Sequence, residues 1–520
     1  MCYNSFVKPN YDPERNTPMP TILPIQGTFD KAIPDNFGNA EYRVERELLI
    51  AIDDIIGQCN LENPVIAYFL DVASVDKYIF VFGTDKSDRL TSTERDAVRA
   101  NAVLALRMAI LRKHLGLSLR KFSLALSHSD LYKWFCGINR FYLPKVPGKS
   151  TVGELENSIP SALTEDIEKR LLRAVQGESC QVLDEPLDFS RSYVDCTCIC
   201  ANIHYPIDWV LLRDSTRTLM KATARIRKLG LRHRMPFEPS VFISKMNKLC
   251  MAMTFAKRKK GAKKRRKAVL RKMKKLLKRV SQHAQNHLKL LESQWQTAYI
   301  PRWKAEQIAR QITGIMSQLA AVVKQAHERI IGERQVDNKD KILSLYEEHI
   351  HVVVRRKAGA EVEFGNTLFL AEQSDGLIID WKLFKQQAPA DSKMLTGSHQ
   401  RIVNRLDCDV TLLVAGDRGF DSRANQIYMQ SHDIFNAVCP RNPRQLRERL
   451  EDNVFRDAQR RRSQTEARIS ILSHCFCGSP MKQKGFEHRY IHMGLSILAH
   501  NLWVLGRLKV AQEHAKQQAA

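Results

Sequence analysis

Three acidic residues, far apart in the chain, stand where carboxylates could do chemistry. Asp417 follows the short apolar run VTLLVAG, whose composition predicts a buried strand. Open α/β sheets place ligands and catalytic groups at the carboxyl ends of such strands. Asp195 lies within a second predicted strand, and Glu466 lies in a helical pattern. If these carboxylates converge, they form a set of hard oxygen ligands of the kind that Mg²⁺ prefers.

Two of these acids also have simpler explanations. Asp417 can cap the helix that starts near Asp421 and Ser422, after a tight turn that Gly419 permits. Asp195 has no obvious partner nearby in the sequence, and it can lie in water at a sheet edge. A buried and unpaired carboxylate would instead call for a metal or a cation to compensate its charge.

The composition points to a polyanionic partner. The chain has 520 residues, of which 82 are Lys or Arg and 56 are Asp or Glu, giving a formal net charge of +26. Hydrophobic residues make up 44%, which is enough for a substantial core and argues against a globally disordered chain. Nucleic acid is the simplest partner for this charge, although attachment to a ribosome or to a membrane surface would also be served by it.

Neither end of the chain, nor any internal stretch, predicts a membrane protein. We find no apolar stretch long enough to span a bilayer, and the N-terminus lacks a signal-peptide pattern. We therefore expect a cytoplasmic protein whose twelve cysteines are mostly thiols. Cys196, Cys198 and Cys200 alternate on one predicted strand without the spacing of a zinc site, so we expect small buried side chains there.

Changes in composition and hydrophobic pattern divide the chain into segments. Residues 1–40 predict an irregular lead-in, and residues 41–185 predict a helical module. In that module, Thr91 and Glu94 predict a capping box at the start of a long helix that ends near Gly116. Short helices at helix-turn-helix spacing follow, and the next one has Ser150 or Thr151 as its predicted N-cap. Such a module can dock on DNA.

The remaining segments alternate between strands and helices. Residues 186–213 contain the Asp195 strand, and residues 214–340 predict a long helical insertion. Residues 341–505 predict two or three strands, a helix, the Asp417 strand, a helix, a further strand and one long helix that carries Glu466. Residues 506–520 predict a C-terminal tail. The order of elements predicts an α/β fold with a mixed sheet flanked by helices.

The helical insertion contains the most basic stretch of the chain. Residues 257–279 hold fifteen bases and no acid. A block of like charges at this density favours contact with phosphates over a merely solvated helix face, and binding through it should depend steeply on salt. The predicted contacts at its start are Lys257, Arg258, Lys259, Lys260, Lys263, Lys264, Arg265, Arg266 and Lys267.

The order of elements and the three acids together resemble the ribonuclease-H-like core of DDE transposases from bacterial insertion sequences. The motifs that carry the resemblance are YVDCTCICANIHYP with Asp195, VAGDRGFDS with Asp417 and RRRSQTEARIS with Glu466. It covers residues 191–505, with a fainter likeness in the helical module. Arg462, four residues before Glu466, fits the Arg-x-x-x-Glu arrangement of these enzymes. Gln459 stands where relatives with the fuller signature have Tyr, and Ser473 stands where they have Lys.

The resemblance implies a function and a set of roles. Residues 186–213 and 341–505 would form a ribonuclease-H-like catalytic domain, in which Asp195, Asp417 and Glu466 bind Mg²⁺, or Mn²⁺ in its place. Arg462 and Arg418 would contact DNA. The partners would be the element's double-stranded ends and a target site, bound by a homodimer in the bacterial cytoplasm. A non-catalytic nucleic-acid-binding protein and a general metal-dependent nuclease remain as alternatives.

Overall fold

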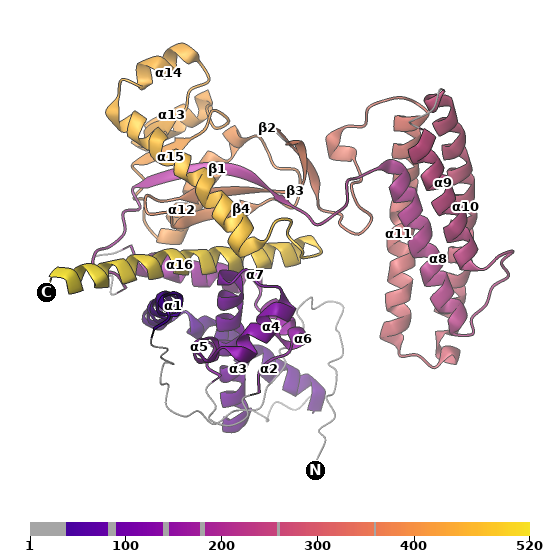
Figure 1. Cartoon of the computed structure of the whole chain (residues 1–520), viewed down its shortest axis with the longest axis horizontal. Coiled ribbons are helices and arrows are strands. Elements are labelled where there is room, and N and C mark those ends of the chain that lie inside the picture. Colours follow the sequence, from indigo (N-terminus) through magenta and orange to yellow (C-terminus); the bar gives the residue numbers. More distant parts are fainter. Residues whose placement is uncertain are drawn as a thin grey trace. The chain divides into compact units, whose positions relative to one another are not determined.

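A computed structural model describes residues 38–81, 90–138, 145–176, 182–256, 261–357 and 360–519 (Figure 1). These residues form two compact units. Unit 1 comprises residues 1–200 and 367–520, and unit 2 comprises residues 201–366. The predicted lead-in of residues 1–40 lies almost wholly outside the described part of the chain.

A single mixed sheet of six strands lies among the helices, in the order β2-β3-β1-β5-β6, with β4 paired to β3. β1 and β5 run parallel, as do β5 and β6, whereas β3 is antiparallel to both β2 and β4. The strands are β1 (Arg191–Cys200), β2 (His351–Lys357), β3 (Ala360–Glu372), β4 (Ile378–Leu383), β5 (Leu413–Gly416) and β6 (Phe435–Val438).

The N-terminal part of unit 1 is helical, as the sequence predicts. Its helices are α1 (Ala40–Gln58), α2 (Glu62–Val81), α3 (Ser92–His114), α4 (Leu119–His128), α5 (Asp130–Phe135), α6 (Lys149–Asn157) and α7 (Ser161–Ala174). The predicted capping box at Thr91 and Glu94 is confirmed at the start of α3. The N-cap of α6 is Gly148, so the prediction of Ser150 or Thr151 is wrong by two or three residues.

The C-terminal part of unit 1 supplies the helices around β4, β5 and β6. They are α12 (Leu395–Leu406), α13 (Arg423–Ser431), α14 (Pro443–Arg449), α15 (Asn453–Ile471) and α16 (Phe486–Ala519), with the short turns η3 (Asp391–Lys393) and η4 (Leu472–Cys477). α16 contains most of the predicted tail of residues 506–520. The single long helix predicted to carry Glu466 is in fact two, because Asp452 caps a new helix after α14.

Two apolar layers fix the sheet in unit 1. Leu413 and Ala415 of β5 pack with Phe455 of α15 on one face. Val414, which points to the opposite face, belongs to the large core that also includes α12 and the N-terminal helices. Successive side chains of a strand point to opposite faces, so this pattern decides which side chains face α15.

Unit 2 is mainly a bundle of four long helices. They are α8 (Asp208–Lys228), α9 (Pro239–Ala256), α10 (Ala262–Gln294) and α11 (Arg302–Ile330), with the short turns η1 (Trp295–Ala298) and η2 (Asn338–Asp340). The helical nature of the predicted insertion is confirmed, although the bundle begins at Asp208. α10 buries Leu270, Met273 and Leu277 in the core of the bundle, at the spacing of one helix face. In the described part of the chain, no helix is both long and apolar enough to cross a membrane.

Candidate active site

Parallel pairing of β1 with β5 places two of the three acids side by side. Tyr193 of β1 is level with Ala415 of β5 in the register of the pair. Asp195 lies two residues after Tyr193 within β1, and Asp417 directly follows Gly416, the last residue of β5. Tyr193 and Ala415 both pack on the face that α15 covers. Because side chains two apart on a strand share a face, Asp195 is turned toward α15 as well.

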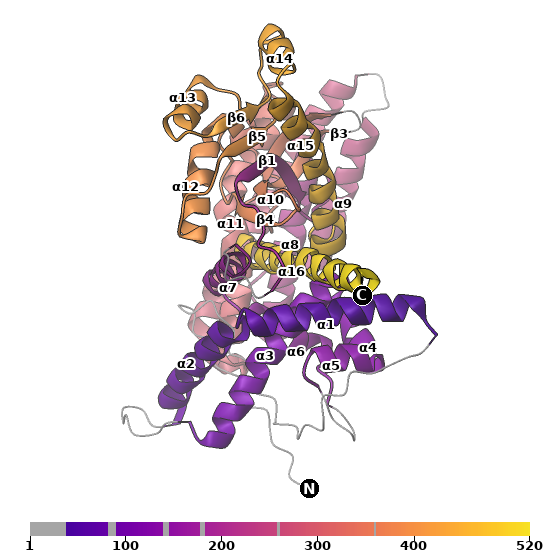
Figure 2. The same cartoon turned by 90° about the vertical axis from the view of Figure 1, so that its left-hand side faces the viewer.

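Helix α15 brings the third acid to this face (Figure 2). Phe455 and Ala458 of α15 are buried against the sheet. Arg462 and Glu466 continue the same side of the helix at intervals of four residues. Arg462 is half-buried and Glu466 is exposed. The helix therefore lies with its apolar start over the strands and carries its Arg-x-x-x-Glu pair along the face on which the two aspartates lie.

Gln459 fastens α15 to the ends of two strands. Its Nε2 donates hydrogen bonds to the carbonyl oxygens of Gly416, at 3.1 Å, and Ala437, at 2.5 Å. Its Oε1 accepts a hydrogen bond of 3.2 Å from Nε of Arg462. Gln459 thus links the carboxyl ends of β5 and β6 to the guanidinium that lies one turn before Glu466.

The electrostatics of Asp195 show that the acids lie near one another. Partial burial, together with the negative charges of Asp417 and Glu466, raises the pKa of Asp195 to about 6. The N–H of Cys196, which donates to Oδ1 of Asp195 at 2.7 Å, and the nearby Arg462 oppose that increase. Asp417, Glu466 and Arg462 therefore all lie close enough to Asp195 to act on its charge.

A fourth carboxylate, Asp391 of η3, borders the turn after Asp417. Oδ1 of Asp417 accepts a hydrogen bond of 2.8 Å from the N–H of Gly419. A Cβ atom on Gly419 would lie 2.6 Å from Oδ2 of Asp391 and 2.9 Å from Oδ1 of Asp417, so a larger residue there would push one of these carboxylates aside. Asp391 also accepts a hydrogen bond from the thiol of Cys196. This turn explains why Gly419 is needed for close packing.

The three predicted acids lack neutralising partners. Among the described residues, no Lys, Arg or His side chain forms an ion pair with Asp195, Asp417 or Glu466. Their described hydrogen bonds come from backbone N–H groups, to Asp195 and Asp417. Carboxylates gathered without cations repel one another, and a divalent ion relieves that repulsion. The donor set, all carboxylate oxygen, is chemically suited to Mg²⁺ or Mn²⁺.

The spacing of the acids is wider than that of a single compact metal site. The ligand oxygens of the three residues do not all lie within 4.8 Å of one another. As they lie in the structure, the three carboxylates therefore do not form one compact metal site.

The predicted DNA-contacting residues differ in their surroundings. Arg418 is exposed on the turn beside Asp417. In unit 2, Lys263 and Lys267 form ion pairs of 2.9 and 2.8 Å with Glu333. Arg266 lies over the ring of Trp209, at 5.3 Å from its centroid.

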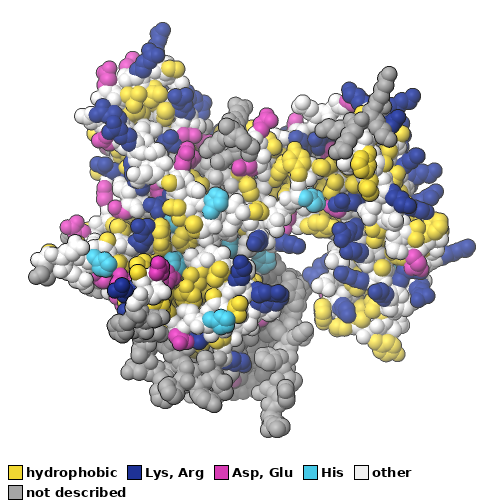
Figure 3. Space-filling view, viewed as in Figure 1, with side chains coloured by type: hydrophobic (Ala, Val, Ile, Leu, Met, Phe, Trp, Pro, Cys, Tyr) yellow, Lys and Arg dark blue, Asp and Glu magenta, His cyan; other side chains and the backbone are white. Residues whose placement is uncertain are grey.

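Two other bases at the start of α10 make no such contact within unit 2. Lys264 and Arg265 are exposed and form no ion pair with a described residue. Lys257, Arg258, Lys259 and Lys260 lie outside the described residues. Figure 3 shows Lys and Arg side chains along the visible edge of the bundle that carries α10. The described start of the basic stretch is thus partly engaged within unit 2 and partly open to solvent.

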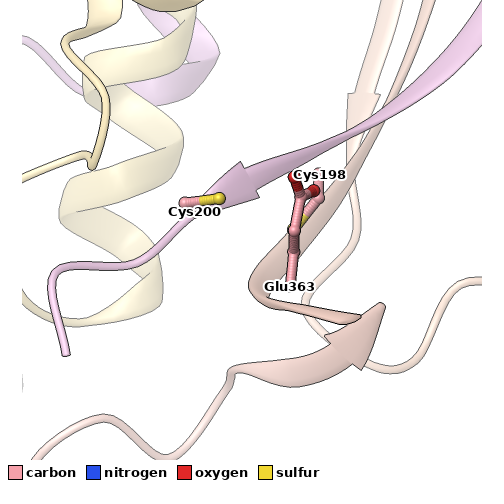
Figure 4. Close-up of side chains that lie close together, drawn as sticks. All are labelled: Cys198, Cys200 and Glu363. Carbon is pink, nitrogen blue, oxygen red and sulfur yellow. The ribbon is translucent and has the colours of Figure 1, made fainter. Parts of the chain in front are cut away.

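The cysteines of β1 differ in their burial. Figure 4 shows Cys198 and Cys200 near the end of that strand. Cys198 is buried, whereas Cys196 and Cys200 are half-buried, and the described cysteines form no disulfide. The expectation of small buried side chains is therefore confirmed for Cys198 and wrong for Cys196 and Cys200, which are partly exposed.

The structure places two further residues, Asp391 and Gln459, beside the acids, and neither was predicted to belong to the site. Asp391 follows a Pro- and Ala-rich loop, and nothing local in the sequence separates it from a turn residue. The contact of Gln459 with Arg462 could have been predicted from the sequence, because Gln459 lies three residues before Arg462 on the same side of a predicted helix.

Comparison with models of protein families, with curated proteins and with solved structures found no match for this chain. The functional interpretation therefore depends on the geometry of the site and on the resemblance of its motifs.

Proposed function

We propose that this protein is a DDE-type DNA transposase with a ribonuclease-H-like catalytic core in unit 1. The single observation that carries the proposal is the proximity of Asp195 in β1 to Asp417, which follows the parallel strand β5, and to Arg462 and Glu466 of α15. Transposase chemistry needs carboxylates at such a place, because charge builds on phosphate oxygens during each displacement.

The proposed reaction has two displacements at phosphorus. In the first, water attacks a phosphodiester at the end of the element, and the bond from phosphorus to the 3′ oxygen breaks. The products are a free 3′ hydroxyl and a 5′ phosphate. In the second, that 3′ hydroxyl attacks a phosphodiester of target DNA, which joins the element to the target and releases a new 3′ hydroxyl.

The residues of unit 1 have distinct roles in this proposal. Asp195, Asp417 and Glu466 would hold two Mg²⁺ or Mn²⁺ ions, which supply Lewis acidity and acidify a bound water. Arg462, oriented by Gln459, would contact a DNA phosphate or hold the Glu466 carboxylate in place. Arg418 on the exposed turn would contact the DNA backbone. Two element ends have to be paired, so a homodimer on DNA, acting in the cytoplasm, belongs to the proposal.

The test is Mn²⁺-dependent nicking of a labelled duplex that carries the DNA flanking this gene, with a scrambled duplex beside it. We expect the wild type to nick at a defined terminal position and Asp417→Asn to bind without nicking. Asp457→Asn, an exposed acid of the same helix as Glu466, is the matched control and should nick normally.

Two other outcomes would replace the proposal with its alternatives. Nicking of both duplexes at many positions, still lost in Asp417→Asn, would indicate a general metal-dependent nuclease with the same site. Binding without nicking by the wild type would indicate a non-catalytic nucleic-acid-binding protein. Equal nicking by the wild type and Asp417→Asn would refute the assignment of the site.

A further inference from the structure

A second feature of unit 1 has the character of a binding site. A cavity of about 810 Å³ is enclosed by residues of the α3–α4 turn, of the start of α6 and of the segment from η4 into α16. We call it the basic pocket. Its exposed basic side chains are Arg120, Lys149, Lys482, Lys484, His474 and His488.

The only acid in the lining of the basic pocket is already neutralised. Glu156 is buried in the floor, where its Oε2 accepts a hydrogen bond of 2.6 Å from Nε of Arg112. Nζ of the buried Lys113 lies 2.5 Å from its other oxygen. Burial disfavours the charged carboxylate, but these two cations hold the pKa of Glu156 well below its usual range. The single floor anion is thus matched by its own cations.

The bases at the rim are not matched by acids. Arg120, Lys149, Lys482 and Lys484 form no ion pair with any residue that the structure describes. The neighbouring Glu487 pairs instead with Lys385, at 2.9 Å. Like charges around one opening repel each other in the empty pocket, and an anion would relieve that repulsion.

Two helix starts add backbone donors to the same opening. Leu119 and Arg120 in the first turn of α4, and Lys149 at the start of α6, all line the pocket. The N-cap of α6 is Gly148, which offers no side chain to the first N–H groups of that helix. Free N–H groups and the positive end of the helix dipole both favour an anion.

Glycines allow the walls of the pocket to approach closely. Gly116 has a φ of +61°, and a Cβ there would lie 2.7 Å from the carbonyl oxygen of Cys475 in η4. A Cβ on Gly153 of α6 would need Leu119 to give way, because it lies 3.1 Å from Cδ1 of that residue. The α3–α4 turn therefore packs tightly on η4, and α4 packs tightly on α6, which brings both helix starts to one opening.

We propose that the basic pocket binds backbone phosphates of a DNA strand. The rim has several separated cations and a volume larger than one small anion needs, and these features match a chain of phosphates better than an isolated ion. The proposal rests on the proposed function for the identity of the nucleic acid, and it deepens that function by placing one DNA contact within the helical module and the start of α16.

The test measures DNA binding without chemistry. The full-length chain is titrated against a fluorescently labelled duplex in EDTA, over a range of salt concentrations. The pocket variant is Lys149→Gln/Lys482→Gln/Lys484→Gln. The matched control, Arg43→Gln/Arg95→Gln/Lys382→Gln, removes three exposed bases of unit 1 outside the pocket, so its net charge is the same.

We expect the pocket variant to lose at least about tenfold in affinity at 0.1 M salt, and its salt slope to fall by up to about 2.7, or 0.9 for each phosphate contact. The control should lose less in both. Equal losses in the two variants would overturn the proposal. Loss of binding to inorganic tripolyphosphate, with DNA affinity equal to the control's, would also overturn it, by making the pocket a site for small anions.

The two proposals fail separately. If the pocket variant binds DNA as the control does while Asp417→Asn loses nicking, the transposase proposal stands and the pocket is not a DNA site. If the pocket variant loses binding but the wild type never nicks, the pocket is a nucleic-acid site on a protein of another function. Thermal unfolding of both variants checks that neither substitution set disrupts the fold.

Discussion

Two groups of acids on the same sheet of unit 1 are treated in opposite ways. Glu372 of β3 and Asp380 of β4 are fully buried, and each is neutralised within the fold. Glu372 accepts from Arg461 at 2.9 Å and from Thr465 at 2.8 Å, both on α15, and Arg468 lies 3.3 Å away. Asp380 accepts two hydrogen bonds from Arg401, at 2.9 and 2.7 Å, and one from Ser398.

Asp195 within β1 and Asp417 just after β5 have no ion-pair partner among the described residues. Helix α15 uses one side, with Arg461 and Arg468, to neutralise Glu372, and another side to present Glu466 near Asp195. A buried carboxylate with its own arginines is a part of the scaffold. Gathered carboxylates without ion-pair partners repel one another, a bound cation relieves that repulsion, and perturbed groups of this kind cluster at functional sites. This difference supports the proposal that Asp195, Asp417 and Glu466 are functional acids and that Glu372 and Asp380 are structural ones.

The largest effect that tests this difference is expected when one acid without an ion-pair partner is neutralised. Asp417→Asn should lower metal-dependent nicking on the order of 10³-fold or more, as removal of a directly acting group does. Its unfolding free energy should be unchanged or higher, because it removes repulsion from Asp195. Nicking assays and urea denaturation of the same preparation measure both. A large loss of stability would place Asp417 with the structural acids.

Removing the arginine partner of a buried, neutralised acid should lower the stability of the fold and not the activity. Arg401→Met leaves the buried Asp380 charged and unpaired, so the free energy of unfolding should fall by about 3–5 kcal/mol. Adding Asp380→Asn should restore much of that loss. Arg460→Met, which removes an exposed partner of Asp457, is the control and should cost less than about 1 kcal/mol. Chemical denaturation measures all of them, and an undiminished Arg401→Met protein would contradict the comparison.

The pH dependence of stability should distinguish the two groups of acids, and this measurement does not depend on activity. The pKa of Asp195 is raised to about 6, above its ordinary value of 3.8, so the folded chain favours its protonated form. This contribution to stability is complete below about pH 4 and is lost as the pH rises through 6. Asp195→Asn should therefore gain on the order of 1–2 kcal/mol relative to the wild type between pH 4 and pH 7.5, without metal.

Denaturation of both proteins at these two pH values, with and without Mn²⁺, measures the effect. Mn²⁺ should stabilise the wild type at pH 7.5 and affect Asp195→Asn less, because the variant has lost a ligand. A difference between the two proteins that does not change with pH would show that the carboxylate of Asp195 is not under strain.

The smallest expected effect extends the same reasoning to the bases of unit 2. Lys264 and Arg265 have no ion-pair partner within the described part of the chain, whereas Lys263 and Lys267 already pair with Glu333. Lys264→Gln/Arg265→Gln should weaken DNA binding several-fold for every sequence and lower the salt slope by up to about 1.8. Lys263→Gln/Lys267→Gln should do less. Equal salt slopes for both variants and the wild type would place this face of α10 away from DNA.

Much of the fold was predictable because its signals are local. The apolar run before Asp417, the alternation around Asp195 and the capping box at Thr91 each depend on neighbouring residues, and each predicted an element that the structure contains. The prediction of one long helix around Glu466 failed because the polar residues of α14 and α15 have a continuous helical composition. The break depends on Asp452, whose carboxylate accepts from the N–H of Val454 at 2.8 Å and starts a new helix.

The site was predictable only in part, for a related reason. The three acids could be chosen from their positions within a strand, after a strand and on a helix, but their proximity depends on long-range pairing of β1 with β5. The proximity of Asp391 depends on how η3 packs against the turn at Gly419, and no spacing in the sequence encodes that contact. The neutralisation of Glu372 and Asp380, which removes them as candidates, is likewise a tertiary property.

The connection from β1 to β2 has a consequence for how this architecture can change. The chain leaves the sheet after β1 and re-enters it at His351 of β2, and Ala201 packs with Leu343 and Ile350 in one apolar cluster. The points at which the chain leaves and re-enters the sheet are thus neighbours. The whole helical bundle is therefore, in topological terms, one long loop between two strands. A single insertion or deletion could add or remove it without breaking the order of the strands, which makes the bundle an exchangeable module that different descendants of one core could gain, enlarge or lose.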